Sequence, residues 1–223
     1  MIFNHNNYRP SNSIEEGNIL RLQNDNNLKI YNKRRSLRSY LIEKYLILSN
    51  RKEWLVNREN TKKEVSLVGK KNTKPYKIEN INISTNVTES YFEDMQIFTL
   101  NDNKNSNQKV IFYIHGGGHL NQPVRFHWNV MDKIAKSLNA KVIAPIYPKV
   151  PHYNYKDVYP KLLSLYKKIL NSPETPKQIT IMGDSAGGNI SLALALYLKN
   201  NNVAQPKDII LISPWVDMVL DNP

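Results

Sequence analysis

Between residues 110 and 212, short apolar runs alternate with longer segments whose apolar residues recur at helical spacing. The short runs are typical of strands that are buried on both faces of a parallel sheet. The longer segments are typical of helices that pack on such a sheet. This alternation predicts an α/β fold, in which a mostly parallel sheet has helices on both faces. The predicted strands are residues 110–114, 142–146, 178–182 and 209–212, and the predicted helices are residues 130–138, 155–169 and 185–199.

The segment before residue 110 is expected to extend this sheet. Residues 78–83 and residues 95–100 both alternate apolar with polar side chains. Such alternation predicts two strands that are half-buried at an antiparallel edge. Residues 102–108 are polar and predict a turn or loop that leads into the parallel part of the sheet.

The N-terminal third of the chain is expected to be partly helical. From Ser36, apolar residues recur at three- and four-residue spacing and predict a helix, and a second short helix is expected around Trp54. Residues 60–75 are rich in lysine and end in a proline, which favours a linker. We therefore divide the chain into an N-terminal segment, residues 1–75, and a second domain, residues 76–223.

Charge is concentrated in the N-terminal segment. The net charge of the chain is +12, and residues 1–75 hold 16 Lys and Arg against 7 Asp and Glu. A basic cluster can mark a surface for nucleic acid or for an anionic membrane. No nucleic-acid-binding motif accompanies this cluster, so a solvated protein surface is the more ordinary interpretation and no nucleic-acid partner is expected.

Composition bears on the compartment and on metal binding. The chain has no cysteine, so it forms neither disulfides nor thiolate metal sites, which suits a reducing compartment such as the cytoplasm. Its N-terminus lacks the pattern of a secretory signal peptide. No run of 18 apolar residues occurs, so no membrane span is expected.

A glycine-rich turn around Ser185 is the strongest sign of chemistry in the sequence. Gly183, Asp184, Ser185, Ala186 and Gly187 follow a predicted strand and open a predicted helix. An abrupt strand-to-helix turn strains the residue at its apex and requires small neighbours. It also presents the serine hydroxyl beside backbone N–H groups and the positive end of the helix dipole. This pattern is typical of a nucleophile elbow, and a glycine-rich turn without chemistry is the alternative.

A second glycine-rich motif follows the strand at residues 110–114. His115 precedes Gly116, Gly117 and Gly118. Successive glycines allow the backbone to turn several N–H groups toward one point, where they can stabilise an oxyanion. A flexible loop is the alternative, since the dinucleotide-binding and P-loop fingerprints are both absent. His115 is expected to hold the loop by a hydrogen bond rather than to act as a general base.

Together, the two motifs resemble the hormone-sensitive-lipase-like family of α/β-hydrolases, which contains esterases and lipases. The first residue of the HGGG motif and Ser185 are 70 residues apart. Residues 147–151 and 213–217 also look like this family, and the resemblance covers roughly residues 76–223. It implies an α/β-hydrolase fold with a helical cap formed by residues 1–75.

The resemblance also implies the reaction and its residues. Ser185 would be the nucleophile in the hydrolysis of a small carboxylic ester, with no metal or organic cofactor. The N–H groups of Gly116, Gly117 and Ala186 would bind the oxyanion. Five further residues of the two motifs would support the nucleophile and the oxyanion hole: His115, Gly118, Gly183, Asp184 and Gly187.

The catalytic partners of Ser185 are not evident after it. In this fold an acid and then a histidine follow the serine in the chain. No histidine follows Ser185, and the last histidine is His152. Two further strand–helix units, roughly 60 residues or more, are therefore expected to be missing, together with the last strands of the sheet. His119 and His152 are the only residues that could replace the missing histidine, and neither is well placed in the chain for that role.

Three hypotheses on function remain open from the sequence. The first is a carboxylic ester hydrolase. The second is an inactive, truncated remnant, or a fragment that needs a second polypeptide to supply the acid and histidine. The third is a basic surface-binding module. Because residues 209–212 would form an uncharged apolar edge strand, self-association through this edge is also expected.

Overall fold

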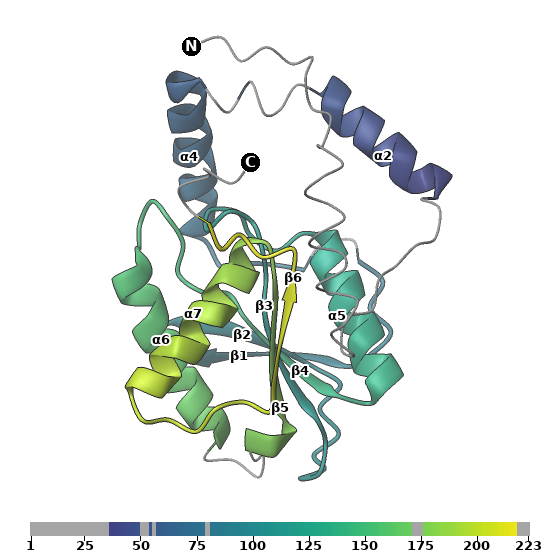
Figure 1. Ribbon diagram of the computed structural model, residues 1–223, viewed down its shortest axis with the longest axis vertical. Coiled ribbons are helices and arrows are strands. Elements are labelled where there is room, and N and C mark those ends of the chain that lie inside the picture. Colours follow the sequence, from purple (N-terminus) through teal and green to yellow (C-terminus); the bar gives the residue numbers. More distant parts are fainter. Residues whose placement is uncertain (1–35, 50–53, 55–56, 79–80, 171–175, 218–223) are drawn as a thin grey trace, which may run out of the picture. The chain divides into compact units, whose positions relative to one another are not determined.

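The computed structural model describes residues 36–49, 54, 57–78, 81–170 and 176–217 (Figure 1). Contacts between backbone positions divide the chain into two units, Met1–Glu53 and Trp54–Pro223. In the first unit the structure describes one helix, α2 (Leu37–Leu48), which confirms the helix predicted from Ser36. The Ser36 side chain caps this helix by accepting a hydrogen bond of 3.2 Å from the Ser39 N–H. The interpretation of the polar stretch before it lies outside the described residues.

The second unit contains a helix in the stretch that the sequence analysis interpreted as a linker. Helix α4 (Arg58–Asn72) occupies most of the Lys-rich stretch, so the prediction of a linker at residues 60–75 was wrong. Asn57 caps its first turn by accepting hydrogen bonds from two backbone N–H groups. Lysine and glutamate are good helix formers, and a charged composition by itself does not distinguish a solvated helix from a linker.

The sheet has six strands in the order β1-β2-β4-β3-β5-β6. The pairs β1–β2 and β2–β4 are antiparallel, and the remaining pairs are parallel. The parallel centre and the antiparallel edge both agree with the sequence. The strands are β1 (Val87–Phe92), β2 (Met95–Leu100), β3 (Val110–Ile114), β4 (Lys141–Pro145), β5 (Ile179–Asp184) and β6 (Asp208–Ile212).

The first edge strand lies later in the chain than expected. The described part of residues 78–83 is not a strand, and β1 begins at Val87 instead. Ile78, Ile81 and Ile83 pack against the buried cluster around Trp128. An extended segment that packs on the core without sheet hydrogen bonds produces the same apolar–polar alternation as a strand, so the pattern could not separate the two.

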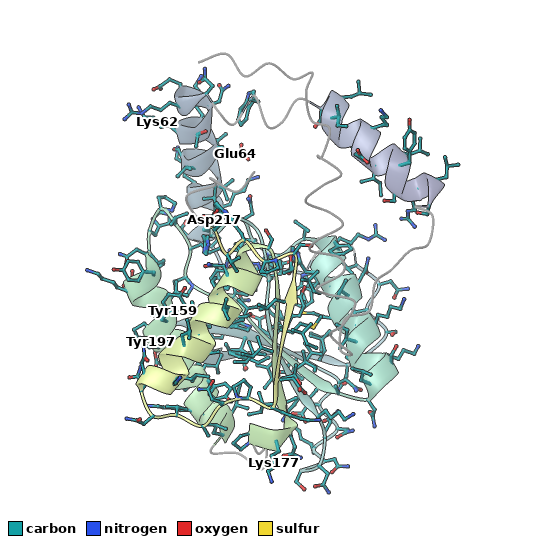
Figure 2. The ribbon with its side chains drawn as sticks, viewed as in Figure 1. Lys62, Glu64, Tyr159, Lys177, Tyr197 and Asp217 are labelled. Carbon is teal, nitrogen blue, oxygen red and sulfur yellow. The ribbon has the colours of Figure 1, made fainter. Side chains whose placement is uncertain are left out.

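Helices cover both faces of the sheet, as predicted. Helices α6 (Tyr155–Leu170) and α7 (Ala186–Asn200) lie on one face, and α5 (Arg125–Leu138) lies on the other (Figure 1). Figure 2 shows Tyr159 of α6 and Tyr197 of α7 side by side, with ring centroids 5.9 Å apart. A 3-10 turn (Pro176–Gln178) precedes β5.

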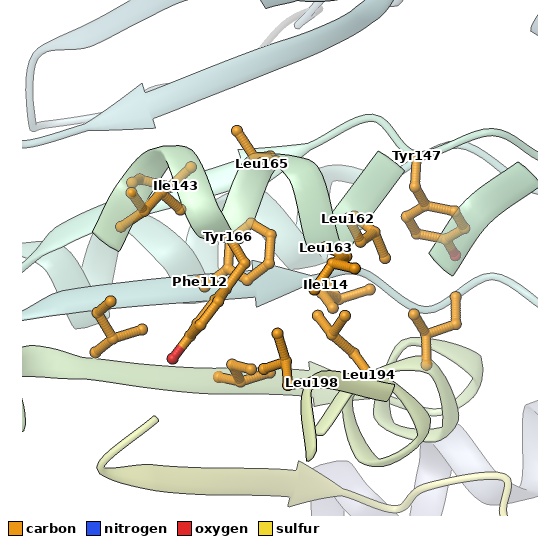
Figure 3. Close-up of a cluster of buried hydrophobic side chains, with 14 of the residues drawn as sticks. Phe112, Ile114, Ile143, Tyr147, Leu162, Leu163, Leu165, Tyr166, Leu194 and Leu198 are labelled. Carbon is orange, nitrogen blue, oxygen red and sulfur yellow. The ribbon is translucent and has the colours of Figure 1, made fainter. Parts of the chain in front are cut away.

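The side chains of β3 alternate between two buried clusters. Phe112 and Ile114 face α6 and α7, where they meet Tyr166 and Leu194 (Figure 3). The other face of β3 contributes Tyr113 to the cluster under α5. Burial on both faces makes the centre of the sheet rigid, and the site described below is built at the carboxyl ends of its strands.

Candidate active site at Ser185

Ser185 occupies a strained turn between β5 and α7. Its backbone angles are φ 49° and ψ −121°, a conformation that side chains of L-residues rarely adopt. Its N–H donates a 2.9 Å hydrogen bond to the Ile212 carbonyl, and its carbonyl accepts from the N–H groups of Trp215 and Asn189, at 3.0 and 3.1 Å. Ser185 is exposed. The fold therefore holds this hydroxyl at the carboxyl edge of the sheet, accessible to a substrate.

Close backbone packing explains two of the glycines around the turn. A Cβ atom on Gly183 would lie 2.5 Å from the Gly187 carbonyl carbon. A Cβ atom on Gly187 would lie 2.6 Å from the His115 carbonyl carbon. Both distances are shorter than Cβ contacts allow, so a side chain at either position would push the helix away. The first turn of α7 therefore rests directly on the end of β3, beside the HGGG motif.

The HGGG loop turns sharply after His115. Gly117 and Gly118 have φ values of 127° and 63°, which only glycine adopts readily. The Gly117 carbonyl accepts hydrogen bonds from the Leu120 and Asn121 N–H groups, at 3.2 and 2.8 Å. These bonds close the loop on itself next to the Ser185 turn.

One predicted oxyanion donor is already occupied. The Gly116 N–H donates a 3.0 Å hydrogen bond to Oδ1 of Asp184, so it is not free to bind a substrate oxygen. This contact contradicts the expectation for Gly116. Gly117 and Ala186 are still candidates. Ala186 is the first residue of α7, where backbone N–H groups have no acceptor within the helix.

Asp184 ties the elbow to the HGGG loop. Its carboxylate accepts hydrogen bonds from the Tyr113 hydroxyl at 2.8 Å, from the Gly116 N–H, and from Nε2 of His127 at 3.2 Å. Burial alone would raise its pKa, but the hydrogen bonds from His127 and Tyr113 outweigh burial and hold the pKa below its usual value. Burial raises the pKa of Tyr113, and the charge of this carboxylate and the hydrogen bond to it raise that pKa further.

The hydrogen bond from Val124 determines the tautomer of His127. Its Nδ1 accepts a 2.9 Å hydrogen bond from the Val124 N–H, so Nε2 carries the proton that is donated to Asp184. His127 is buried, as is most of this network. The sequence analysis missed Tyr113 and His127 because neither lies in a motif: one is an inward residue of a strand and the other a residue of a helix.

His115 holds the loop, as expected, and is unsuited to be a base. Its Nδ1 donates to the Gly116 carbonyl at 2.6 Å, and its ring stacks on Tyr147 with centroids 4.6 Å apart. Complete burial lowers its pKa well below the usual value, with a further lowering from the charge of Lys149. The imidazole is therefore neutral at physiological pH and packed inside the protein.

His119 and His152, the possible replacements for the missing histidine, contact other parts of the protein. Nε2 of His152 donates to the Gly69 carbonyl at 2.9 Å, which binds it to α4. The His119 ring lies 6.0 Å from the ring of Trp215, and burial lowers its pKa. In the part of the chain that the structure describes, no hydrogen bond joins a histidine to the Ser185 hydroxyl.

Replacing Asp184 tests this network. We expect Asp184→Asn to lower the free energy of unfolding by about 3 kcal/mol at pH 7, because one amide N–H would face the Nε2–H of His127. A lowered pKa in the folded state means that the carboxylate stabilises the protein above its unfolded pKa. That stability is lost as the pH falls through the folded pKa.

Urea unfolding at pH 7 and at pH 3 to 4 measures this effect. The difference between the native chain and Asp184→Asn should shrink at the lower pH. Asp208→Asn is the control, because this carboxylate is exposed on β6 and should give a small, constant difference. An Asp184→Asn chain as stable as the native chain at pH 7 would mean that the network adds nothing to the fold.

Neither a metal centre nor a membrane span is seen among the described residues. No three His, Cys, Asp or Glu side chains gather there in a way that would hold a metal ion. No described helix has both the length and the apolar character needed to cross a bilayer.

A serine in a strained turn between a parallel strand and the helix that follows it is typical of the α/β-hydrolase class. A family model described as alpha/beta hydrolase fold matches residues 111–223, half of the chain. This chain belongs to that family, which confirms the fold predicted from its two motifs.

Several known proteins are similar to this chain. It is 35% identical over 112 residues to a protein named Esterase from Acinetobacter venetianus, a match that covers 50% of this chain and 37% of that protein. A structure described as a "putative esterase" from Staphylococcus aureus matches with a TM-score of 0.70 and 30% identity, over 74% of this chain and 56% of that one. An esterase from the bacterial hormone-sensitive lipase (HSL) family shares the fold, with a TM-score of 0.57 and 20% identity, over 69% of this chain and 57% of that one. This chain thus spans less than two thirds of each of these proteins.

Proposed function

We propose that this chain carries the nucleophile half of a carboxylic ester hydrolase of the esterase or lipase type. The observation that carries the proposal is the strained, exposed Ser185 at the start of α7, in backbone contact with the HGGG loop. The relatives named esterases support the reaction class. Small or medium esters are the proposed substrates, and residues 1–75 are the proposed cap.

The proposed reaction has two steps. The Ser185 oxygen attacks the ester carbonyl carbon while its proton passes to a general base, and the N–H groups of Gly117 and Ala186 bind the oxyanion. Collapse of this intermediate breaks the bond to the alcohol, which leaves with a proton. Water then attacks the acyl-enzyme and releases the carboxylic acid and the free serine.

None of the four described histidines is assigned as the general base. His115, His127 and His152 each make a hydrogen bond that serves the fold, and His119 lies beside Trp215. These positions favour the second candidate, in which the chain by itself is inactive and a second polypeptide or segment supplies the acid and histidine.

Turnover of p-nitrophenyl acetate and butyrate separates the two candidates. We expect the purified 223-residue chain to hydrolyse both esters no faster than its Ser185→Ala variant, since a serine hydroxyl without a base is a weak nucleophile. The release of p-nitrophenol measures the rate. Robust turnover that depends on Ser185 would refute the missing base, and His119→Ala would then be the next variant to measure.

A further inference from the structure

The two proposed oxyanion donors belong to separate segments of the chain. The Gly117 N–H lies in the loop after β3, and the Ala186 N–H lies at the start of α7. Both groups must point at one oxygen, at donor distances of about 2.7–3.1 Å, to stabilise the charge that develops there. A misplacement of about 1 Å can lower a catalysed rate by about 100-fold. The rate therefore depends on how the HGGG loop is held relative to the Ser185 turn.

Asp184 joins these two segments beyond the end of the sheet. The last paired residues of β3 and β5 are Ile114 and Gly183. Past this pair, the Gly116 N–H donates a 3.0 Å hydrogen bond to Oδ1 of Asp184, so a side chain continues the link. A Cβ atom on Gly116 would collide with Oδ2 of Asp184 and lie 2.8 Å from the Asp184 carbonyl oxygen. The carboxylate therefore fills the space beside the loop and holds the loop next to the Ser185 turn.

His127 binds the second oxygen of this carboxylate. Oδ1 of Asp184 accepts from the Tyr113 hydroxyl at 2.8 Å and from the Gly116 N–H, whereas Oδ2 accepts from Nε2 of His127 at 3.2 Å. The last torsion of an aspartate side chain has a broad energy minimum, so a donor on each oxygen is needed to fix the plane of the carboxylate. His127 belongs to α5, on the face of the sheet opposite α7 (Figure 1). It therefore acts on the HGGG loop through Asp184.

The His127 ring is itself held in place from two sides. Its Nδ1 accepts the 2.9 Å hydrogen bond from the Val124 N–H. Its edge packs against the His115 ring, with centroids 5.8 Å apart. The residue is only 6% exposed, so water does not readily take its place as a donor to Asp184. These contacts aim the Nε2–H group at the carboxylate.

We propose that His127 is a positioning residue for ester hydrolysis, because it holds Asp184 against the HGGG loop. This inference rests on the proposed function of Ser185. Without the Nε2–H group, the carboxylate turns away from the Gly116 N–H, and the peptide that carries the Gly117 N–H is no longer held in place. The oxyanion develops only as the reaction proceeds, so the loss falls on kcat while KM changes little.

Two amide variants separate the two hydrogen bonds of His127. In His127→Asn the amide lies about where Nδ1 was and can still accept from the Val124 N–H. In His127→Gln the amide lies about where Nε2 was and can still donate to Asp184. The variants are compared in a fusion of this chain to the C-terminal part of the Staphylococcus aureus relative. We expect His127→Asn to lower kcat for p-nitrophenyl butyrate about tenfold or more with little change in KM, and His127→Gln to retain most of kcat.

The opposite order of the two variants would overturn the proposal. A loss of kcat in His127→Gln but not in His127→Asn would show that His127 serves only the first turn of α5. A change in KM alone, or native kcat in a folded His127→Asn, would overturn it as well. Thermal unfolding shows whether each variant is folded. His127→Met, which also lacks the donor, takes the place of His127→Asn if that variant is unfolded.

Asp132→Asn is the matched control for a purely structural effect. This second carboxylate on α5 accepts hydrogen bonds from the backbone and hydroxyl groups of Ser84 and Thr85, at 2.7–3.0 Å. It makes none of the contacts of the Ser185 turn, so its loss should lower the thermal stability and leave kcat unchanged. An equal fall of kcat in Asp132→Asn and His127→Asn would assign the effect to general loss of stability and overturn the proposal.

Amide NMR spectra of the 223-residue chain test the positioning role without turnover. In His127→Asn the Gly116 amide proton should move upfield as it loses its carboxylate acceptor, and the Gly117 signal should move with it. His127→Gln should resemble the native chain. All samples carry Ile210→Lys/Ile212→Lys to limit association through the edge strand. An inactive native fusion would count against the proposed function alone, whereas native Gly116 and Gly117 signals in a folded His127→Asn would overturn the positioning role.

Discussion

A fusion of this chain to the C-terminal part of the Staphylococcus aureus relative is expected to hydrolyse p-nitrophenyl butyrate. The two proteins share their fold with a TM-score of 0.70, and the match leaves 44% of the relative outside it. The elbow and the HGGG loop are already in contact in this chain. The fusion therefore has to add only an acid and a histidine at the same edge of the sheet. The rate of p-nitrophenol release gives kcat and KM.

Variants within the same fusion identify the groups that act. Ser185→Ala should lower kcat by about 10⁶, the size of effect seen when a triad nucleophile is removed. Gly117→Pro displaces one proposed oxyanion donor, because proline cannot adopt the φ of 127° at this position, and should lower kcat by about 10²–10³ or more. Ser137→Ala, at an exposed position of α5, is the matched control and should be fully active. A soluble, folded fusion without activity would show that the site around Ser185 does not support ester hydrolysis.

The isolated chain is expected to aggregate, or to form a dimer through β6. This strand lies at the end of the strand order and pairs only with β5 among the described strands. Its residues Ile209, Ile210 and Ile212 are 38%, 43% and 40% exposed. The strand has one charge, on Asp208 at its start, and the four residues after it are apolar. An edge strand with such an apolar stretch pairs readily with a second chain.

Charges placed on this strand should reduce self-association. We expect the double variant Ile210→Lys/Ile212→Lys to raise the soluble fraction and to move the chain toward a monomer, as measured by size-exclusion chromatography with light scattering. Phe126→Lys/Leu138→Lys is the matched control, since it adds the same charge at two exposed apolar positions of α5. A native chain that is already a monodisperse monomer with a sharp thermal transition would contradict the prediction. Equal gains from both double variants would place the cause in net charge rather than in the edge.

Local sequence patterns were a good guide to the elements around the site. The strand before His115 is a continuous apolar run and the strand before Ser185 is mostly apolar, and each lies next to glycines that a tight turn requires. Buried strands and strained turns leave such signatures because they depend on a few neighbouring residues. The Lys-rich helix α4 and the extended segment at residues 78–83 were misjudged because their local patterns fit two structures equally well.

By itself, the sequence determined the α/β class, the order of the main elements and the place of Ser185, since periodicity and turn chemistry are local properties. Only the tertiary structure decided which backbone N–H groups and side chains are free. The Gly116 N–H is occupied by a carboxylate 68 residues away in the chain. His127 reaches that same carboxylate from a helix, and Lys149 becomes buried. Burial and hydrogen bonding between distant segments arise only when the sheet and its helices close around them, so no local pattern records them.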